Sequence, residues 1–133
     1  MKLGVLYVVA TPIGNLEDIS LRAINILGSV DIILCEDTRH TGLLLSKYNL
    51  KQARLISYQD FNELQRIPEV IGLLMEGKKI ALVSDAGTPL ISDPGYKLIN
   101  ECIKRDIKVI PIPGASALTA ALSVSGLPTN NFL

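Results

Sequence analysis

Apolar and polar positions follow one another along this chain in blocks rather than residue by residue. Short continuous runs rich in Val, Ile and Leu alternate with longer segments in which apolar residues recur every three or four positions. Continuous runs are typical of parallel strands covered on both faces, and the longer spacing is typical of helices. The predicted strands are Gly4–Ala10, Ile32–Cys35, Arg54–Ser57, Ile80–Ser84 and Lys108–Ile112.

Residues that start or stop helices stand at the ends of the helical segments. Gly28 and Gly77 follow two helix ends, and Ser116 opens the last helix. Asp93 before Pro94 is a usual pair of N-cap and first helical residue, and a proline at position 68 is expected to break or kink the third helix. The helices are predicted near residues 19–27, 40–48, 61–76, 95–105 and 116–125.

Strands that alternate with helices through right-handed crossovers form an open, doubly wound parallel sheet. The sequence therefore predicts an α/β fold with a five-stranded parallel sheet and helices on both faces. Its 133 residues suit one domain. Because two apolar residues, Phe132 and Leu133, follow the polar linker after the last helix, we expect residues 1–133 to be an N-terminal domain that a C-terminal domain follows.

Three loops rich in Gly and Pro follow predicted strands. The segment 83–95 holds two Gly and two Pro, and it exceeds the roughly 2–6 residues of an ordinary strand-to-helix connection. Gly lets the main chain approach a ligand, and Pro fixes its direction. The loop at 10–18 is of the same kind, and the loop at 111–116 puts backbone amides at a helix start, which favours an anion or a carboxylate. Because loops after parallel strands gather at one edge, a ligand site is predicted there.

Two further loops at this edge are polar. Glu36-Asp37-Thr38-Arg39-His40-Thr41 follows the second strand. Helix capping explains the acids but leaves the neighbouring Arg39 and His40 unexplained, so we interpret this loop as functional. The loop at 58–62 could stack on a nucleic-acid base through its aromatic residues, although Asp60 would serve equally well as an N-cap.

Composition narrows the classes of function. Thirteen basic and thirteen acidic residues cancel, which argues against holding nucleic acid by charge alone but leaves room for an enzyme that acts on folded RNA. His40, Cys35 and Cys102 lie in different elements, so neither a metal nor a disulfide is expected. No apolar run reaches the ~18–20 residues of a membrane span. Pro12 and Gly14 follow the first apolar run too soon for a signal peptide, and a cytoplasmic location is expected.

Four segments resemble motifs of the tetrapyrrole methylase superfamily, the class III S-adenosylmethionine methyltransferases, and within it the branch that acts on ribosomal RNA. They are residues 10–19, 35–41, 83–95 and 113–117, in the order of the family and spread over the chain. The resemblance implies S-adenosylmethionine as cofactor, bound in a cleft between this domain and a C-terminal one, and a homodimer. It also implies 2′-O-methylation of a cytidine ribose in the decoding region of 16S rRNA, within the small ribosomal subunit.

The resemblance further implies which residues hold the cofactor. Residues 86–88 match the Gly-Gly-Asp-type turn of the family, and Ser116 with Ala117 matches its Thr-Ala-like pair. Thr88 stands where the porphyrinogen branch commonly has Asp, and this departure favours the RNA branch. The cofactor-binding residues implied in this way are Pro12, Asp85, Ala86, Gly87, Thr88, Pro89, Ile91, Ser116 and Ala117.

The implied reaction needs a proton acceptor, because a ribose hydroxyl is a poor nucleophile at neutral pH. Four carboxylates are predicted at the same sheet edge, at positions 18, 36, 37 and 85. Glu36 and Asp37 are the candidates for the catalytic base. Arg39 is the candidate for contact with an RNA phosphate, and Asn15 is a second candidate substrate contact.

Three alternatives remain open on the sequence. A tetrapyrrole (porphyrinogen or precorrin) C-methyltransferase would have the same fold and cofactor. A nucleotide-binding Rossmann-type domain fits the alternation of strands and helices, but the chain lacks G-x-G-x-x-G, and it also lacks the P-loop motif. A non-enzymatic interaction domain fits the 48% hydrophobic content, but it leaves the three Gly/Pro loops unexplained.

Overall fold

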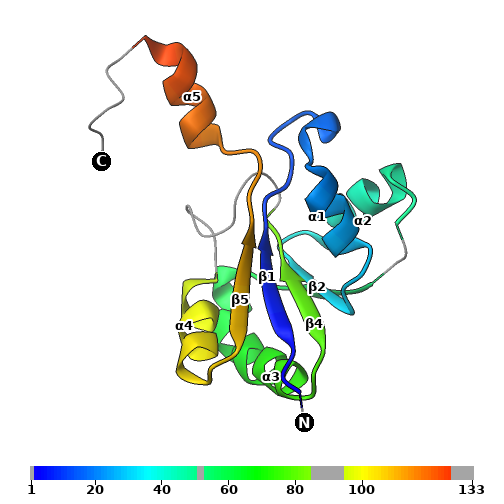
Figure 1. The fold of residues 1–133 in the computed structure, drawn as a ribbon, viewed down its shortest axis with the longest axis vertical. Helices are drawn as coiled ribbons and strands as arrows, with labels where there is room; N and C mark the ends of the chain where they lie inside the picture. The colour runs from blue at the N-terminus through cyan, green and yellow to red at the C-terminus, as the bar shows by residue number, and fades with distance from the viewer. Residues whose placement is uncertain (1, 51–52, 85–94, 127–133) are drawn as a thin grey trace.

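A single parallel sheet forms the centre of the molecule (Figure 1). The structure, a computed structural model, describes residues 2–50, 53–84 and 95–126. The strands pair in the order β3-β2-β4-β1-β5, and every pairing is parallel. The predicted five-stranded parallel sheet is confirmed. Its strands are β1 (Val5–Val9), β2 (Ile32–Cys35), β3 (Arg54–Ser57), β4 (Lys79–Leu82) and β5 (Lys108–Ile112).

Helices cover both faces of the sheet, as the sequence predicts. α1 (Leu21–Leu27) and α2 (Thr38–Lys47) pack on one face. α3 (Glu63–Met75) and α4 (Tyr96–Lys104) pack on the other. Two short 3-10 turns, η1 (Leu16–Asp18) and η2 (Asp60–Asn62), precede α1 and α3. The doubly wound α/β fold is therefore confirmed for these four helices.

Both faces of each central strand are apolar, which explains the continuous runs in the sequence. In β2, Ile32 and Leu34 join the core under α3 and α4, whereas Ile33 and Cys35 join the core under α1 and α2. All four residues are buried. Side chains alternate between the two faces of a strand, so a strand covered on both sides needs apolar residues at every position.

Two expectations about helix starts were wrong, and α3 does not break at Pro68. α4 begins at Tyr96 with Gly95 as N-cap, because the φ of 133° at Gly95 is not helical. The predicted start at Pro94 is therefore incorrect, and Pro94 itself lies outside the described residues. α3 runs unbroken through Pro68, which removes one helical hydrogen bond, at the carbonyl of the exposed Leu64. α3 starts at Glu63, and Asp60 is part of η2 rather than an N-cap.

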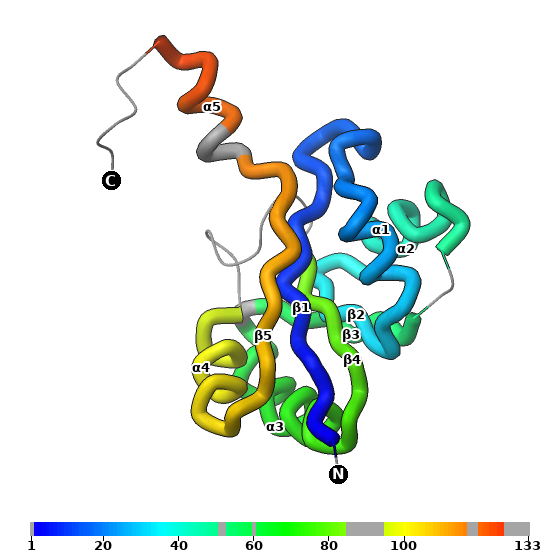
Figure 2. Tube along the Cα trace, viewed as in Figure 1, coloured from blue at the N-terminus to red at the C-terminus, as the bar shows by residue number. Residues whose placement is uncertain are grey.

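α5 (Ala117–Ser125) differs from the other helices. It continues from β5 and stands away from the sheet, beyond the edge at which the strands end (Figures 1 and 2). Residues 120, 121 and 123–126 are exposed. Its existence and place in the chain agree with the prediction, but it covers neither face of the sheet.

Candidate functional site

The strand order places the topological switch point of the sheet at β4. β4 lies between β2 and β1, and both neighbours lead into helices on the face opposite α4. The chain after β4 therefore turns to one face while the chains after β2 and β1 turn to the other. Open α/β sheets bind ligands at such a switch point. The segment 85–94, where most of the predicted cofactor residues lie, follows β4.

The loops after β1 and β5 come close to each other, and the first also contacts the carboxyl end of β4. Thr11 is buried, and its hydroxyl donates to the carbonyl of Ser84 at 3.3 Å. The neighbouring Pro12, a predicted cofactor residue, is also buried. A Cβ on Gly114 would lie 3.0 Å from the Cβ of Ala10, so glycine lets the two loops come together there. The structure therefore brings the predicted loops at 10–18 and 111–116 to the same place.

A second feature of this edge is an open depression of about 520 Å³ beside β2 and β3. The two candidate bases and the candidate phosphate contact all line it. Glu36 and Asp37 are half-buried, while Arg39 is exposed. The depression thus brings together three residues that were singled out from the sequence. Its lining is Glu36, Asp37, Thr38, Arg39, Ser57 and Gln59.

Capping of α2 explains the position of Asp37 at the rim of the depression. Asp37 is the N-cap of α2, and its Oδ1 accepts a hydrogen bond from the backbone N–H of Arg39 at 2.9 Å. Its carbonyl accepts from the N–H of Thr41. The helix start therefore holds Asp37 in a fixed conformation at the rim of the depression. This is the capping role that the sequence allows, and it coexists with a place in the candidate site.

The two aromatic residues of the loop at 58–62 differ in exposure. Tyr58 is fully buried, so its ring cannot stack on a nucleic-acid base, and this part of the expectation is wrong. Tyr58 continues the alternation of β3 and faces the same core as Ile56. Gln59 instead points to the site, and its Nε2 donates to the carbonyl of Glu36 at 2.6 Å. Phe61 is exposed.

The other predicted site residues have separate positions. Asn15 is exposed, and its Oδ1 accepts from the N–H of Glu17 at 3.0 Å, which caps η1. Asp18 is also exposed within η1. Ser116 is half-buried at the start of α5 and accepts from the N–H of Ala120 through its carbonyl. The predicted residues Asp85, Ala86, Gly87, Thr88, Pro89 and Ile91 lie outside the described residues, and nothing is described of the side chain of Ala117.

Sequence reasoning placed Thr38 in the functional loop, but it missed Ser57 as a lining residue and the contact of Gln59. Ser57 is the last residue of β3 and lies level with Cys35 in the sheet. A rule that takes the last residue of each parallel strand would have found it. The bond from Gln59 to Glu36 joins residues 23 positions apart, and local sequence carries no signal for such a contact.

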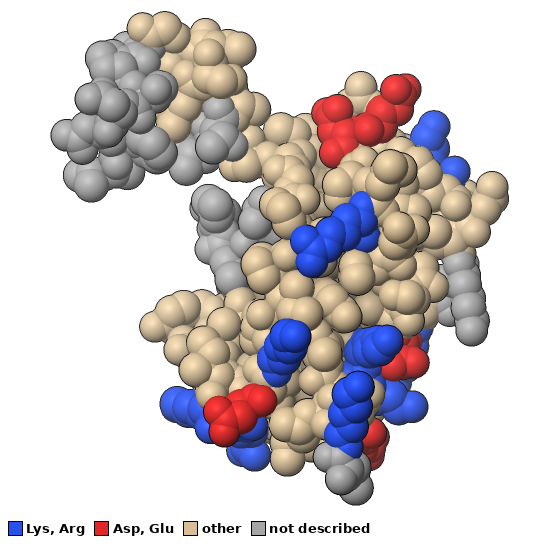
Figure 3. Space-filling view, in the orientation of Figure 1, with Lys and Arg blue, Asp and Glu red and all other residues tan. Residues whose placement is uncertain are grey.

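Charge at the surface is mixed. Figure 3 shows Lys and Arg spread over several elements of the visible face, with Asp and Glu among them. Within the described ranges, no three metal-ligating side chains are grouped so as to hold an ion. No helix in this part of the chain is long and apolar enough to cross a membrane.

Comparison with known proteins identifies several relatives. The family model of the tetrapyrrole (corrin/porphyrin) methylases matches residues 5–132. A protein named ribosomal RNA small subunit methyltransferase I, from Thermotoga maritima, is 54% identical over 98% of this chain and 59% of its own length. The protein of the same name from Escherichia coli is 54% identical over 97% of this chain and 45% of its own length. The chain therefore spans about half the length of these curated relatives.

Solved structures agree on the fold. A uroporphyrin-III C-methyltransferase from Thermus thermophilus superposes with a TM-score of 0.69 at 24% identity, over 94% of this chain and 54% of that protein. A conserved hypothetical protein from Aeropyrum pernix gives a TM-score of 0.77 at 19% identity, over 96% of this chain and 44% of that one. At these identities the likeness concerns the fold alone.

Proposed function

Because the chain belongs to the tetrapyrrole (corrin/porphyrin) methylase family, we propose that the whole protein is an S-adenosylmethionine-dependent methyltransferase whose substrate is small-subunit ribosomal RNA. The observation that carries the proposal is the identity of 54% to proteins named ribosomal RNA small subunit methyltransferase I. The acceptor we propose is the ribose 2′-hydroxyl of a cytidine in the decoding region of 16S rRNA, within the small subunit. Its place of action is the cytoplasm.

The residues around β4 fit the proposed cofactor. Near the carboxyl end of β4, Thr11 makes a buried contact with Ser84, and Gly114 packs against Ala10 in the loop that leads to the start of α5 at Ser116. Backbone amides at a helix start suit the carboxylate of an amino acid moiety. When bound, S-adenosylmethionine supplies a methyl group activated by the positive sulfonium. Pro12, residues 85–91 and Ser116 with Ala117 are the residues that we propose to hold it.

The acid loop after β2 has the chemistry that a hydroxyl acceptor requires. The ribose oxygen must lose its proton as its bond to the methyl carbon forms, and a carboxylate within hydrogen-bond reach can accept that proton. Glu36 or Asp37 is the proposed acceptor, because both line the depression and both are half-buried. Arg39, exposed on the same rim, is proposed to contact a phosphate of the RNA, with Asn15 as a second contact.

A tetrapyrrole substrate is the second candidate, since uroporphyrin-III C-methyltransferase shares the fold. A porphyrinogen carries several carboxylates and is a polyanion like RNA, so the polar lining of the depression at Glu36, Asp37 and Arg39 does not separate the two substrates. RNA is favoured by the 54% identity to proteins named ribosomal RNA small subunit methyltransferase I. The identity of 24% to that enzyme adds nothing on the substrate.

One labelling experiment separates the two candidates. The full-length protein is given labelled S-adenosylmethionine with small-subunit particles that lack the modification, with naked 16S rRNA, and with a porphyrinogen. Label mapped to a ribose of the particle RNA supports the rRNA proposal. Label found in the porphyrinogen alone overturns the substrate and keeps the methyltransferase chemistry, while label in none of the three overturns the proposal as a whole.

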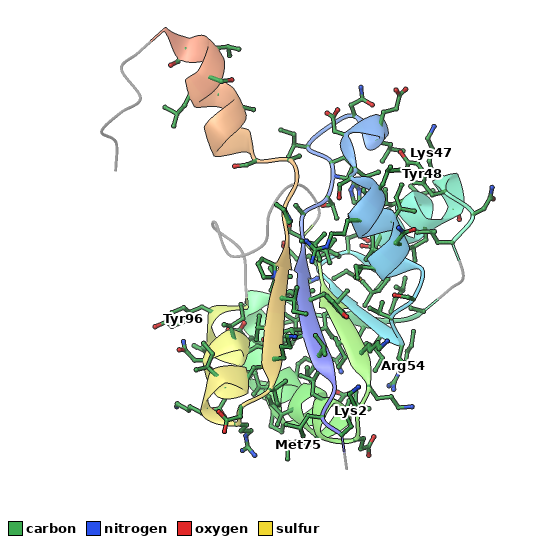
Figure 4. The ribbon with its side chains drawn as sticks, in the orientation of Figure 1. Lys2, Lys47, Tyr48, Arg54, Met75 and Tyr96 are labelled. Atoms are coloured by element: carbon green, nitrogen blue, oxygen red, sulfur yellow. The ribbon has the colours of Figure 1, made fainter. Side chains whose placement is uncertain are left out.

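The proposal includes a homodimer, and the face formed by α3 and α4 supports it. Leu64 and Tyr96 are 70% and 73% exposed, although both are large and apolar in most of their surface. They line a groove of about 470 Å³, and Tyr96 points outward from α4 (Figure 4). Light scattering of the full-length protein tests this. The double variant Leu64→Glu, Tyr96→Glu should be monomeric, and an unchanged dimer mass would exclude this face.

A further inference from the structure

A buried carboxylate lies next to the candidate site. Glu63 opens α3 and is only 6% exposed. Its Oε2 accepts two hydrogen bonds, from the hydroxyl of Tyr58 at 2.9 Å and from the backbone N–H of Gly95 at 2.7 Å. Taking a carboxylate out of water costs free energy unless donors replace the water, and these two donors do so. Three elements thereby meet at one oxygen: the end of β3, the start of α3 and the N-cap of α4.

The second donor to Glu63, the N–H of Gly95, lies at the end of the predicted cofactor segment. Gly95 is the N-cap of α4, with a φ of 133° that L side chains rarely adopt. It is also the residue through which the predicted cofactor segment joins α4. At the other flank of that segment, the carbonyl of Ser84 accepts from the hydroxyl of Thr11. Each flank is therefore held by a side chain from another part of the chain, Thr11 in the loop after β1 and Glu63 in α3.

The same turn also holds the loop that carries the candidate base. Gln59 donates through Nε2 to the carbonyl of Glu36 at 2.6 Å. The backbone N–H of Gln59 donates to Oδ1 of Asn62 at 2.7 Å, which ties Gln59 to the residue before Glu63. Two hydrogen bonds thus lead from one short turn to two predicted parts of the site. One reaches the candidate base loop, and the other reaches the end of the cofactor segment.

Tyr58 is suited to remain the donor in this contact. Burial, together with the hydrogen bond and the negative charge of Glu63, raises the pKa of Tyr58 well above its ordinary value. The phenol therefore keeps its proton throughout the working range of pH. Its ring is fully buried among the core residues of α3 and α4, which fixes the position of the hydroxyl.

We propose that Glu63 is a positioning residue for the methyl-transfer site: by holding Gly95 to the β3–α3 turn, it sets where the cofactor-binding segment meets α4 relative to Glu36. This inference deepens the proposed function and depends on it. Glu63 does not touch the substrate in this role. An apolar residue at position 63 would take this acceptor away from the hydroxyl of Tyr58 and the N–H of Gly95, so it is the carboxylate that joins the two segments.

The test compares three variants of the full-length protein. Glu63→Asp keeps the charge but withdraws the carboxylate from Gly95, and Glu63→Gln keeps the length and one acceptor oxygen. Val70→Ala is the matched control. Val70 is fully buried on the same helix, so shortening its side chain lowers stability, but this apolar side chain cannot accept a hydrogen bond from Gly95. The readouts are the affinity for S-adenosylmethionine by calorimetry, amide hydrogen exchange at Gly95 without cofactor, and the thermal midpoint.

We expect Glu63→Asp to weaken cofactor binding about tenfold and to speed exchange at Gly95, since a bond to a charged acceptor is lost. Glu63→Gln should stay within about threefold of the wild type, because its amide oxygen can accept both bonds. Val70→Ala should lower the thermal midpoint while changing neither affinity nor exchange at Gly95. This pattern separates positioning from a general loss of stability.

The contrary outcomes point to different failures. If the wild type binds the cofactor and Glu63→Asp binds it equally well, the positioning role is overturned and the proposed function stands. Equal loss of affinity in Glu63→Asp and Val70→Ala also overturns it, because stability alone would then explain the effect. If the wild type does not bind S-adenosylmethionine, the proposed function fails, and this inference fails with it.

Discussion

The two edges of the sheet use their polar groups in different ways. At the amino edge, where Lys2, Arg54 and Met75 lie (Figure 4), turns are short and their polar atoms bond to neighbouring strands. Asp31, for example, accepts from the N–H of Lys79 through Oδ2 at 2.8 Å. At the carboxyl edge the loops are longer, and charged side chains line an open depression. The amino edge therefore joins the secondary-structure elements, while the carboxyl edge carries the side chains that we propose to act on a ligand.

The main chain of the amino edge is closely packed around Gly4. Its N–H donates to the carbonyl of Leu74 at 2.7 Å, and a Cβ built on it would lie 1.8 Å from the carbonyl oxygen of Lys78. No real side chain tolerates that distance, so the strand start and the α3–β4 turn fit together only with glycine. If the two edges act independently, substitutions at the amino edge should change stability and leave methyl transfer intact, and substitutions at the carboxyl edge should do the reverse.

The largest effect is expected from Gly4→Ala. The new Cβ would collide with main chain rather than with a flexible side chain, so β1 or the turn before β4 must move. We expect a loss of more than about 3 kcal/mol in the free energy of unfolding, or failure to fold. Urea unfolding followed by circular dichroism measures it. Lys2→Ala, at an exposed position of the same edge, is the control and should change stability little. A stable Gly4→Ala protein would contradict the described contact.

At the carboxyl edge, Glu36→Gln and Asp37→Asn should act on chemistry and spare stability. Whichever carboxylate is the base, its amide variant should lose at least about 100-fold in methyl transfer, since general-base catalysis contributes that much or more. Asn caps helices as well as Asp does, so the free energy of unfolding of Asp37→Asn should lie within about 0.5 kcal/mol of that of the wild type. Single-turnover transfer and RNA binding are measured together. Normal turnover in both variants would show that neither residue is the base.

The success of the fold prediction has a physical basis. β2 has the predicted bounds, because a strand buried on both faces is apolar at every position and its ends are marked by polar residues. β3 and β5 also have the predicted bounds, although they are the two edge strands and are only partly buried. The prediction failed at the start of α4, where the capping residue is set by main chain geometry at Gly95 and by an acceptor 32 residues away. A break at Pro68 was also wrong, because a single lost hydrogen bond on an exposed stretch does not end a helix.

The candidate site was only partly predictable. Glu36, Asp37 and Arg39 stood out because charged residues after an apolar strand are unusual, and all three line the depression. The burial of Tyr58 could have been read from its spacing of two from Ile56 on the same strand face. Glu63 gave no signal, because a glutamate at a helix start is ordinary on the surface. Only the tertiary fold brings Gly95 and Tyr58 to it.

Arg39→Ala tests the carboxyl edge through RNA affinity, with a smaller expected effect than the substitutions at Glu36 and Asp37. Arg39 is exposed, and no ion pair of its side chain is recorded within the described part of the chain, so stability should change by less than about 0.5 kcal/mol. If it contacts a phosphate, RNA affinity should fall severalfold, and the slope of log affinity against log salt should drop by about one. Filter binding over a salt series measures both. An unchanged slope would remove Arg39 from the RNA contact.

Asp31→Ala is the counterpart at the amino edge. It removes the acceptor for the N–H of Lys79 but keeps the main chain bonds of residue 31 to Lys79 and Arg54. We expect a loss of about 1 kcal/mol in stability, with cofactor affinity and methyl transfer unchanged. Asp31→Asn, which keeps an acceptor oxygen, should recover much of the loss. A fall in methyl transfer in the folded Asp31→Ala protein would break the separation between the edges.

The smallest effect is expected at two helix glycines that lie away from tight contacts. Gly72 in α3 and Gly42 in α2 have nothing within 4 Å of a built Cβ, so alanine fits at both. Each substitution should stabilise the protein by about 0.5–1 kcal/mol, because alanine loses less backbone entropy in a helix than glycine. Thermal and urea unfolding measure the gain.

Gly42 lies one residue beyond Thr41 in the helix that Asp37 caps, so its variant also probes the site. Equal gains with full methyl transfer in both would mean that stiffening α2 leaves the carboxyl edge intact. A gain with lost transfer at Gly42 alone would mean that this edge needs the freedom that glycine gives.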